Sequence, residues 1–244
     1  MKFYEPKPLS DASRALLRET STATLTSVLF KRGLKTIFMN GPKPLNPGAG
    51  RMVGPAYTIR MMPMREDFGS NNEINVRPDY PQRKAIEETP AGHVLCFDCR
   101  GETRAGTVGE ILVERLRVRG VAGLCVDGAV RDGAAVAALG LPVFCAAVTA
   151  PPSMTHHVAF DAQLAVVCGG VTVFPGDILV GDGDGVVVIP NNIADAVAQE
   201  GAEKEQQEQY IFKRIAGGDA VLGVYPPNEK TLTDYAAWKN QQGH

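Results

Sequence analysis

A strand–helix–strand pattern in the middle of the chain constrains the fold more than any other feature. Residues His93–Asp98 alternate like a strand, Thr107–Arg119 have the apolar periodicity of a helix, and Val121–Val126 form a second apolar run that ends at Asp127-Gly128. Two parallel strands joined through a helix make a right-handed crossover unit. The predicted class is therefore α/β, with helices packed on a sheet that is at least partly parallel.

Further segments extend this pattern in both directions. Helices are expected over residues 11–32, 82–88, 133–139 and 192–216 and around Trp238, and strands over 52–61 and 142–148. Short strands with tight turns are expected over 163–189, with a β-hairpin around Asp182-Gly183-Asp184. The chain is predicted to be one domain over residues 1–244, with a core over about 20–216 and a C-terminal helical arm over about 191–244.

Two segments need a choice between interpretations. The stretch Pro63–Pro81 is polar and too long for an ordinary connection, so it is either a functional flap or a mobile insertion. The stretch Gly181–Gly185 begins like a calcium loop but lacks the spaced third acid and the distal glutamate. A turn between two strands is the better interpretation of that stretch.

Composition and charge exclude several classes of partner. The sequence has 25 basic and 27 acidic residues, which gives no electrostatic basis for binding nucleic acid or an anionic membrane. No apolar run approaches the ~20 residues that span a bilayer. The N-terminal sequence lacks the apolar centre of a signal peptide, so a cytoplasmic protein is expected.

The five cysteines do not predict a metal or redox motif. Cys96 and Cys99 form a C-x-x-C, but they lie in a strand-like run, where residues three apart point to opposite faces. No second C-x-x-C or suitably spaced histidine completes a zinc set. The prediction is buried structural thiols.

Candidate ligand-binding residues lie where predicted strands end and helices begin. Arg131 and Asp132 follow the apolar run that starts at Val121, and ligands in α/β folds bind beyond the carboxyl ends of strands. A guanidinium can grip a carboxylate with two hydrogen bonds, and an aspartate can hold a hard divalent cation. The alternative is an N-capping Asp132 beside a surface arginine.

The loop before residue 110 offers a second candidate. Gly106–Glu110 opens a helix, so its backbone N–H groups and the helix dipole favour an anion such as a carboxylate. Glu110 could instead be an ordinary acid that compensates the dipole. His156 and His157 follow two prolines in a loop, and a surface or hydrogen-bonding role is favoured for them over catalysis.

Several segments together resemble one family. These are Gly54–Thr58, AGTVGE (Ala105–Glu110), the run that contains VDGAVRD (Val126–Asp132), and PGDILVGDGDGVVVIP (Pro175–Pro190). The family contains the regulator of ribonuclease E activity A and the class II 4-hydroxy-4-methyl-2-oxoglutarate aldolases. The resemblance implies a swivelling β/β/α fold, assembled as a homotrimer or a pair of trimers with sites between subunits.

The resemblance also implies roles for individual residues. Arg131 matches the arginine that grips the substrate, and Asp132 matches the acid that holds Mg²⁺ or Mn²⁺. Glu110 stands where the aldolases have an acid that positions a catalytic water. The substrate carboxylate would be held by the backbone of Thr107, Val108, Gly109 and Glu110.

Active members also take a glutamate from the C-terminal helix of a neighbouring subunit. This sequence offers Glu203, Glu205 and Glu208, of which Glu205 is favoured.

The function implied by the resemblance is a divalent-metal-dependent carbon–carbon lyase. It would act on a pyruvate-type keto acid, as an aldolase of the 4-hydroxy-4-methyl-2-oxoglutarate or 4-carboxy-4-hydroxy-2-oxoadipate type with oxaloacetate decarboxylase activity. The alternative is a non-catalytic, protein-binding regulator of ribonuclease E-type RNA degradation. The presence of Glu110 and Asp132 favours the enzyme. Methyl transfer is disfavoured, since no Gly-rich strand–loop–helix opening is followed by an acid at a second strand end.

Overall fold

The long strand β2 (Met52–Pro63) joins the two parts of the main sheet. We describe residues 5–69 and 71–241 of a computed structural model. β2 pairs antiparallel with β9 (Ile178–Asp182), parallel with β3 (Val94–Asp98), and antiparallel with β6 (His157–Ala162). The strand order is β1-β5-β4-β3-β2-β9-β10, with β6 on β2. β2 therefore connects the parallel part of the sheet to the antiparallel part.

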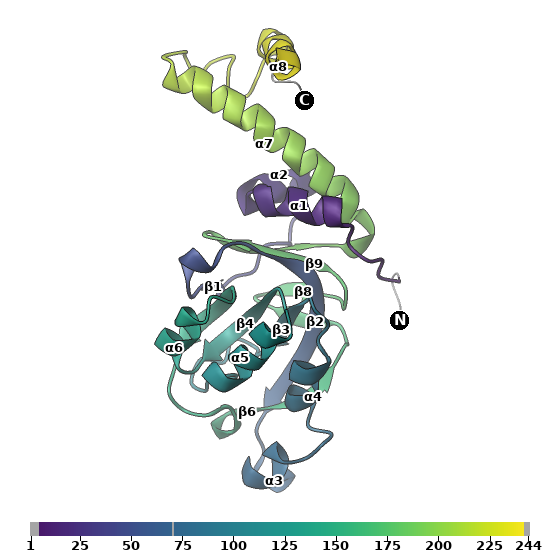
Figure 1. Cartoon of the computed structure of the whole chain (residues 1–244), viewed down its shortest axis with the longest axis vertical. Coiled ribbons are helices and arrows are strands. Elements are labelled where there is room, and N and C mark those ends of the chain that lie inside the picture. Colours follow the sequence, from purple (N-terminus) through teal and green to yellow (C-terminus); the bar gives the residue numbers. More distant parts are fainter. Residues whose placement is uncertain (1–4, 70, 242–244) are drawn as a thin grey trace.

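The parallel part confirms the predicted crossover units. β3, β4 (Gly123–Val130) and β5 (Val143–Val148) lie side by side in parallel. Helix α5 (Glu110–Val118) connects the first pair and α6 (Gly133–Ala138) connects the second, and both lie on the same side of the sheet in Figure 1. Loops at the carboxyl ends of these strands form one edge of the molecule.

Two predicted boundaries in this region were wrong. β4 does not end at Asp127-Gly128 but continues to Val130, after a register shift between Val126 and Ala129. The Asp127 carboxylate accepts hydrogen bonds from the N–H groups of Cys99 (2.5 Å) and Gly169 (3.2 Å), so this residue braces two loops within the strand. The helix begins at Glu110 rather than Thr107.

The antiparallel part of the sheet almost closes it into a barrel. β9 and β10 (Gly185–Ile189) form the predicted hairpin, and β1 (Lys43–Pro44) pairs with β5 at the other end of the strand order. Lys43 Nζ donates to the Asp184 carbonyl at 2.5 Å, which links the two ends. A separate two-stranded sheet is made by β7 (Val166–Cys168) and β8 (Val171–Val173).

The N-terminal segment forms two helices, where the sequence predicted one over Asp11–Arg32. α1 (Asp11–Glu19) and α2 (Thr22–Lys31) are separated by extended backbone at Thr20 and Ser21. The break has a local cause, because Ser21 Oγ accepts from Thr24 N (3.1 Å) and so caps a new helix.

The hairpin turn Gly181–Gly185 supports the start of α2. Asp182 carboxylate oxygens accept from both the N–H and the hydroxyl of Thr22, each at 2.8 Å, and from Asp184 N at 3.0 Å. This turn confirms the strand–turn–strand interpretation, and its aspartate binds a helix end.

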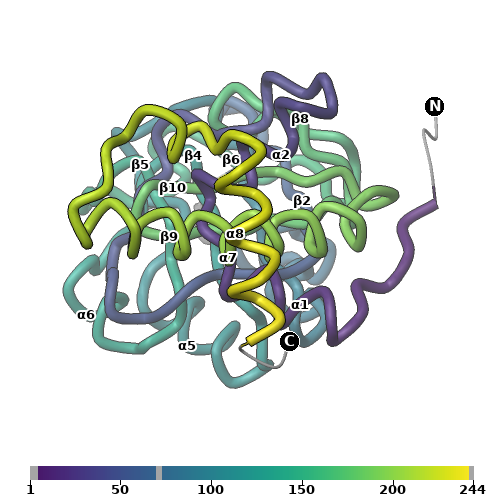
Figure 2. The backbone as a smooth tube through the Cα atoms, turned by 90° about the horizontal axis from the view of Figure 1, so that it is seen from above, coloured from purple at the N-terminus to yellow at the C-terminus, as the bar shows by residue number. Residues whose placement is uncertain are grey.

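The C-terminal arm consists of α7 (Ala194–Ala216) and α8 (Glu229–Gln241). The first half of α7 packs on α1 and α2, while its second half extends away from the sheet (Figure 1). α8 crosses over α7 (Figure 2), and ring contacts such as Tyr210–Trp238, with centroids 5.4 Å apart, hold the two helices together. Among the described residues, no helix is long and apolar enough to cross a membrane.

The stretch between β2 and α4 (Pro81–Glu88) contains two short helices that the sequence did not predict. These are η2 (Glu66–Phe68) and α3 (Asn71–Asn75). The remaining short helices are η1 (Pro47–Ala49), η3 (Ser153–Thr155) and η4 (Asn191–Ile193). The stretch thus brings α3 and α4 against the crossover units.

All five cysteines are buried, as predicted. Cys99 belongs to the core cluster under α4 and α5, whereas Cys96 faces the cluster inside the curved sheet. The sequence did not reveal that Cys96, Cys125 and Cys168 come together, with sulfur atoms within 4.8 Å of one another. Burial raises the pKa of Cys145 to about 11 and that of Cys99 further still, so these thiols stay protonated.

The native protein should therefore resist thiol reagents. We expect no fast reaction of the folded protein with 5,5′-dithiobis(2-nitrobenzoate) at pH 8, because only an accessible thiolate attacks the reagent. Once guanidinium chloride unfolds the chain, its five thiols should release five equivalents of thionitrobenzoate. Rapid modification of any thiol in the folded protein would contradict this burial.

Candidate active site

The loop before α5 lies along the end of β4, and this contact builds the candidate site. Thr107 N donates to the Ala129 carbonyl at 2.7 Å, and Arg131 N donates to the Val108 carbonyl at 2.8 Å. The Thr107 N–H is thus not free for a ligand, contrary to the prediction. Within the described residues, the N–H groups of Val108 and Gly109 have no hydrogen-bond acceptor, and they stand at the start of α5. Together they remain a candidate anion site.

Two glycines make this close approach possible. A Cβ atom on Gly106 would lie 2.2 Å from Arg131 Cγ and 2.9 Å from Arg131 N. A Cβ atom on Gly109 would lie 2.5 Å from Asp132 Oδ2. The Gly-x-x-Gly spacing in AGTVGE is therefore needed to let the two residues that follow β4 lie across the loop.

Arg131 and Asp132 are held beside each other but in different surroundings. Arg131 is half-buried, and its Nε is buried without a hydrogen-bond partner in the described part of the chain. Asp132 is exposed and has a left-handed backbone with φ of 56°. This conformation costs of order 1 kcal/mol for a non-glycine residue, and such strain often marks functional positions.

The Asp132 side chain does not act as an N-cap, so that alternative was wrong. It makes no capping hydrogen bond to α6. Instead, Asp132 Oδ2 lies near the start of α5 and accepts a long hydrogen bond of 3.4 Å from Glu110 N. The contact brings the predicted metal ligand and the predicted water-positioning acid to one place.

A cavity of about 120 Å³ opens beside this loop. Arg131 and residues 106–109 line one side of it. The other side comes from residues that sequence reasoning missed, among them Asn75, Gln82, Arg83 and Ser153.

Gln82 ties the two sides of the cavity together. It is buried, and its Nε2 donates to the Thr107 carbonyl at 2.6 Å. A signal was available in the sequence, since Gln82 lies three and four residues before the buried Ala85 and Ile86, on the same helix face. A glutamine on an apolar stripe needs a buried partner.

The acids at the site suit a hard divalent cation but do not form a complete ligand set. Glu110 and Asp132 are exposed, and neither forms an ion pair within the described part of the chain. The only group of three or more potential ligands among the described residues is the thiol cluster. Mg²⁺ commonly uses one or two carboxylates and keeps several waters. The exposed Asp132 carboxylate at the start of α5 therefore fits such an ion.

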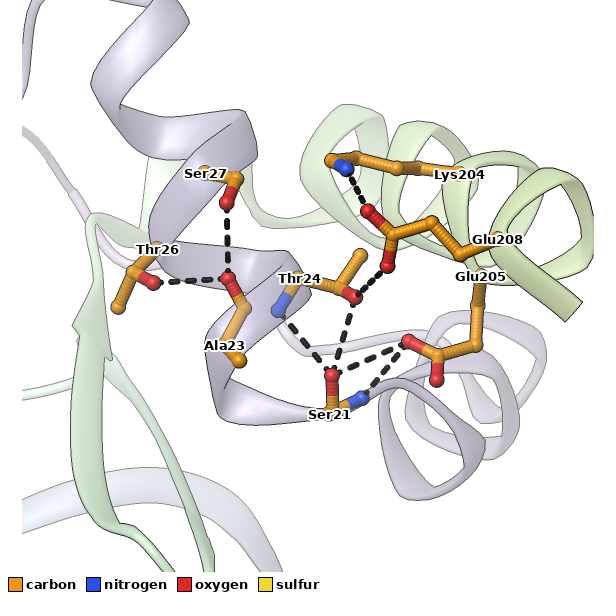
Figure 3. A network of polar contacts seen from close by, with 8 residues as sticks. All are labelled: Ser21, Ala23, Thr24, Thr26, Ser27, Lys204, Glu205 and Glu208. Atoms are coloured by element: carbon orange, nitrogen blue, oxygen red, sulfur yellow. Dashed lines mark hydrogen bonds and ion pairs between the residues drawn. The ribbon is translucent and has the colours of Figure 1, made fainter. Parts of the chain in front are cut away.

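The C-terminal glutamates lie elsewhere in the same chain. Glu205 accepts hydrogen bonds from the N–H and hydroxyl of Ser21, both at 3.2 Å (Figure 3). Glu208 accepts from Thr24 Oγ1 and pairs with Lys204. α7 is separated from α5 by the sheet (Figure 1), so Glu205 does not join Arg131 within one chain. A contribution to a neighbouring subunit stays a prediction.

Glu203, the remaining candidate, is also committed within the chain. It accepts from Tyr235 Oη at 2.9 Å and pairs with Lys239. It therefore fastens α8 to α7.

His157 is neither on the surface nor hydrogen-bonded, so the role favoured from the sequence was wrong. It opens β6 and has no exposed surface, and both ring nitrogens lack partners among the residues that the structure describes. Burial lowers its pKa to about 4. Its neighbour His156 is half-buried.

The comparisons with known proteins place the chain in a family. Residues 9–188 match the model of the RraA-like family, described as Aldolase/RraA, and the chain belongs to this family. A protein of Halalkalibacterium halodurans, provisionally named a 4-hydroxy-4-methyl-2-oxoglutarate aldolase, is 33% identical over 78% of this chain and 82% of its own length.

Two solved structures share the fold. Streptomyces coelicolor RraAS2, described as an unusual member of the RNase ES inhibitor RraA family, aligns with a TM-score of 0.74 and 30% identity over 84% of this chain and 97% of its own. An uncharacterized protein from Pseudomonas syringae aligns with a TM-score of 0.81 and 24% identity over 92% of this chain and 98% of its own. The expected family fold is confirmed.

The glycine contact can be tested by stability. Gly106→Ala should lower the free energy of unfolding by roughly 1–3 kcal/mol, because the added methyl group displaces Arg131. Gly183→Ala is the matched control, since a Cβ atom there meets nothing within 4 Å. Urea unfolding of both variants measures the difference, and equal midpoints would rule out the close approach.

His157 should make the protein sensitive to acid. Its pKa of about 4 in the folded state lies below the value of about 6.5 of an unfolded chain. The folded state binds fewer protons between these values, so the contribution present at pH 7 is lost as the pH falls through this window. Between pH 7 and pH 5, the free energy of unfolding should fall by about 2 kcal/mol more in the native protein than in His157→Met. Urea unfolding of both proteins at pH 7 and pH 5 measures this difference. An identical pH dependence of the two free energies of unfolding would exclude His157 as the source of the acid sensitivity.

Proposed function

We propose that this protein is a divalent-metal-dependent carbon–carbon lyase that acts on a pyruvate-type keto acid. The observation that carries the proposal is the arrangement at the end of β4. The half-buried Arg131 and the exposed Asp132 lie against Gly106 and Gly109 of the loop, whose Val108 and Gly109 N–H groups are unused. This arrangement offers cationic and N–H donors for a substrate carboxylate and a carboxylate for a metal.

Each residue then has a distinct task. The N–H groups at the start of α5 would bind the substrate carboxylate, and Arg131 would stabilise the negative charge that builds on the keto oxygen as the bond breaks. Asp132 would hold Mg²⁺ or Mn²⁺, which when bound supplies Lewis-acid polarisation of the substrate oxygens. The electron pair of the broken bond stays on the three-carbon fragment, which takes up a proton and leaves as pyruvate.

The same site could support two related reactions. In aldol cleavage of a 4-hydroxy-4-methyl-2-oxoglutarate type of substrate, a base must remove the proton of the distal hydroxyl, and a water oriented by Glu110 is the candidate. In oxaloacetate decarboxylation, carbon dioxide leaves and no base is required. The name of the Halalkalibacterium halodurans relative supports the aldolase.

We propose further that the protein assembles with copies of itself. Phe30 on α2 and Phe212 on α7 are 62% and 72% exposed, and Leu222 beyond α7 is 94% exposed. A hollow of about 920 Å³ between α2 and α7 adds to this apolar surface. Exposed apolar groups of this kind commonly mark contacts between subunits. Such an assembly would bring α7 of one subunit toward another.

A second candidate function is protein binding. Streptomyces coelicolor RraAS2 belongs to a family named for inhibition of a ribonuclease, and a regulator needs neither Glu110 nor Asp132. The two acids and the strained backbone at Asp132 favour the lyase.

The lyase is tested by oxaloacetate turnover. With Mg²⁺, the protein should release pyruvate faster than the metal ion alone, and a chelator should abolish this excess. Arg131→Ala should lower the rate by about a hundredfold or more, because it removes the charge that stabilises the transition state. Arg117→Ala is the control, since that arginine pairs with Glu114 on the outer surface of α5.

Near-normal turnover by Arg131→Ala would overturn the assignment of that residue. No excess over free Mg²⁺ in the native protein, together with retention of a ribonuclease E-type partner on immobilised protein, would favour the regulator.

A further inference from the structure

A second arginine lines the cavity that contains Arg131. Arg83 lies on α4, is half-buried, and borders the same 120 Å³ space. Its Nη2 makes one long hydrogen bond, 3.5 Å, to the side-chain oxygen of Asn75 on α3. Within the described part of the chain, no carboxylate forms an ion pair with Arg83.

The lack of an acidic partner sets Arg83 apart from its neighbours. Arg65 and Arg77, on the preceding segment, pair with Asp67 at 2.7 Å and Asp79 at 2.9 Å. Residues lining the cavity include no aspartate or glutamate. Two arginine side chains therefore border a small space, and no acid is among its described lining residues.

The helix that carries Arg83 is held against the candidate catalytic residues. The adjacent Gln82 is buried and bonded to the Thr107 carbonyl at 2.6 Å. On the same helix, Ala85 and Ile86 are buried in the core. Asn75 contacts the guanidinium through a neutral oxygen at 3.5 Å, which leaves its positive charge intact.

We propose that Arg83 is a specificity-determining residue, which binds a second carboxylate at the end of the substrate remote from the keto acid. This inference rests on the proposed function, which assigns the first carboxylate to the loop and Arg131. A cavity of about 120 Å³ limits the bound ligand to a small molecule. That space suits a short substrate with one anionic group at each end.

A keto acid with an apolar tail would fit less well. Such a tail would cover Arg83 without offering an acceptor, and a buried charge without a partner is unfavourable. A distal carboxylate would instead make a charge-assisted, two-pronged hydrogen bond. Specificity would then depend on α4 and on the segment that precedes it, while the chemistry depends on the loop and the end of β4.

The test compares two unreactive ligands of equal chain length. 2-Oxoglutarate and 2-oxopentanoate differ only in whether the far end is a carboxylate or a methyl group. Isothermal titration calorimetry with Mg²⁺ should show that the native protein binds 2-oxoglutarate more tightly by roughly 10- to 100-fold, as expected for a hydrogen bond between charged groups.

Arg83→Met should remove this preference and leave the affinity for 2-oxopentanoate unchanged. Arg83→Lys should keep part of it. Lys84→Met is the matched control, because Lys84 is exposed on the same helix and approaches Glu88 at 3.7 Å instead of lining the cavity; this variant should behave like the native protein.

The failures are distinguishable. Equal affinities of the native protein for both ligands, or an equal loss of both in Arg83→Met, overturn the inference about Arg83. If Arg131→Ala still abolishes binding in that case, the keto-acid site itself stands. If the native protein binds neither ligand, the proposed function fails and the role of Arg83 fails with it.

Discussion

The contact between the end of β4 and the loop before α5 is the constraint on which the site depends. Two backbone hydrogen bonds hold the loop against the strand, and two glycines leave room for the side chains that follow the strand. Because β4 continues to Val130, Arg131 and Asp132 come directly after the last residue of the strand and lie beside the start of α5.

Much of this arrangement could be read from the sequence, and the exceptions have physical causes. The crossover units, the hairpin and the C-terminal helices follow from apolar periodicity. The extension of β4 was hidden because Asp127-Gly128 reads as a turn, yet the buried Asp127 carboxylate binds two loops. The break between α1 and α2 has a local part, the Ser21 cap, and a distant part. The acceptors at Asp182 and Glu205 lie 160 and 184 residues away along the chain, so no local pattern could reveal them.

The candidate site was predictable only in part, for a similar reason. Residues 107–110, Arg131 and Asp132 carry local signals, since they stand where strands end and helices begin. Asn75 and Arg83 carry none, because they reach the cavity only once α3 and α4 pack against the crossover units. The segment before α4 thus contributes to the cavity. The sequence left open whether this segment is a functional flap or a mobile insertion.

The side chains at this site bear on how one fold can serve both enzymes and binding proteins. The fold alone does not decide between them, because function depends on the side chains placed at its loops. Here the half-buried Arg131, the strained Asp132 and the exposed Glu110 have no structural task that would need all three together. Each would be replaceable in a pure binding module, where a guanidinium nitrogen buried without a partner and a left-handed aspartate only reduce stability. Their joint presence next to a cavity with no acid among its described lining residues supports the proposed lyase over the regulator.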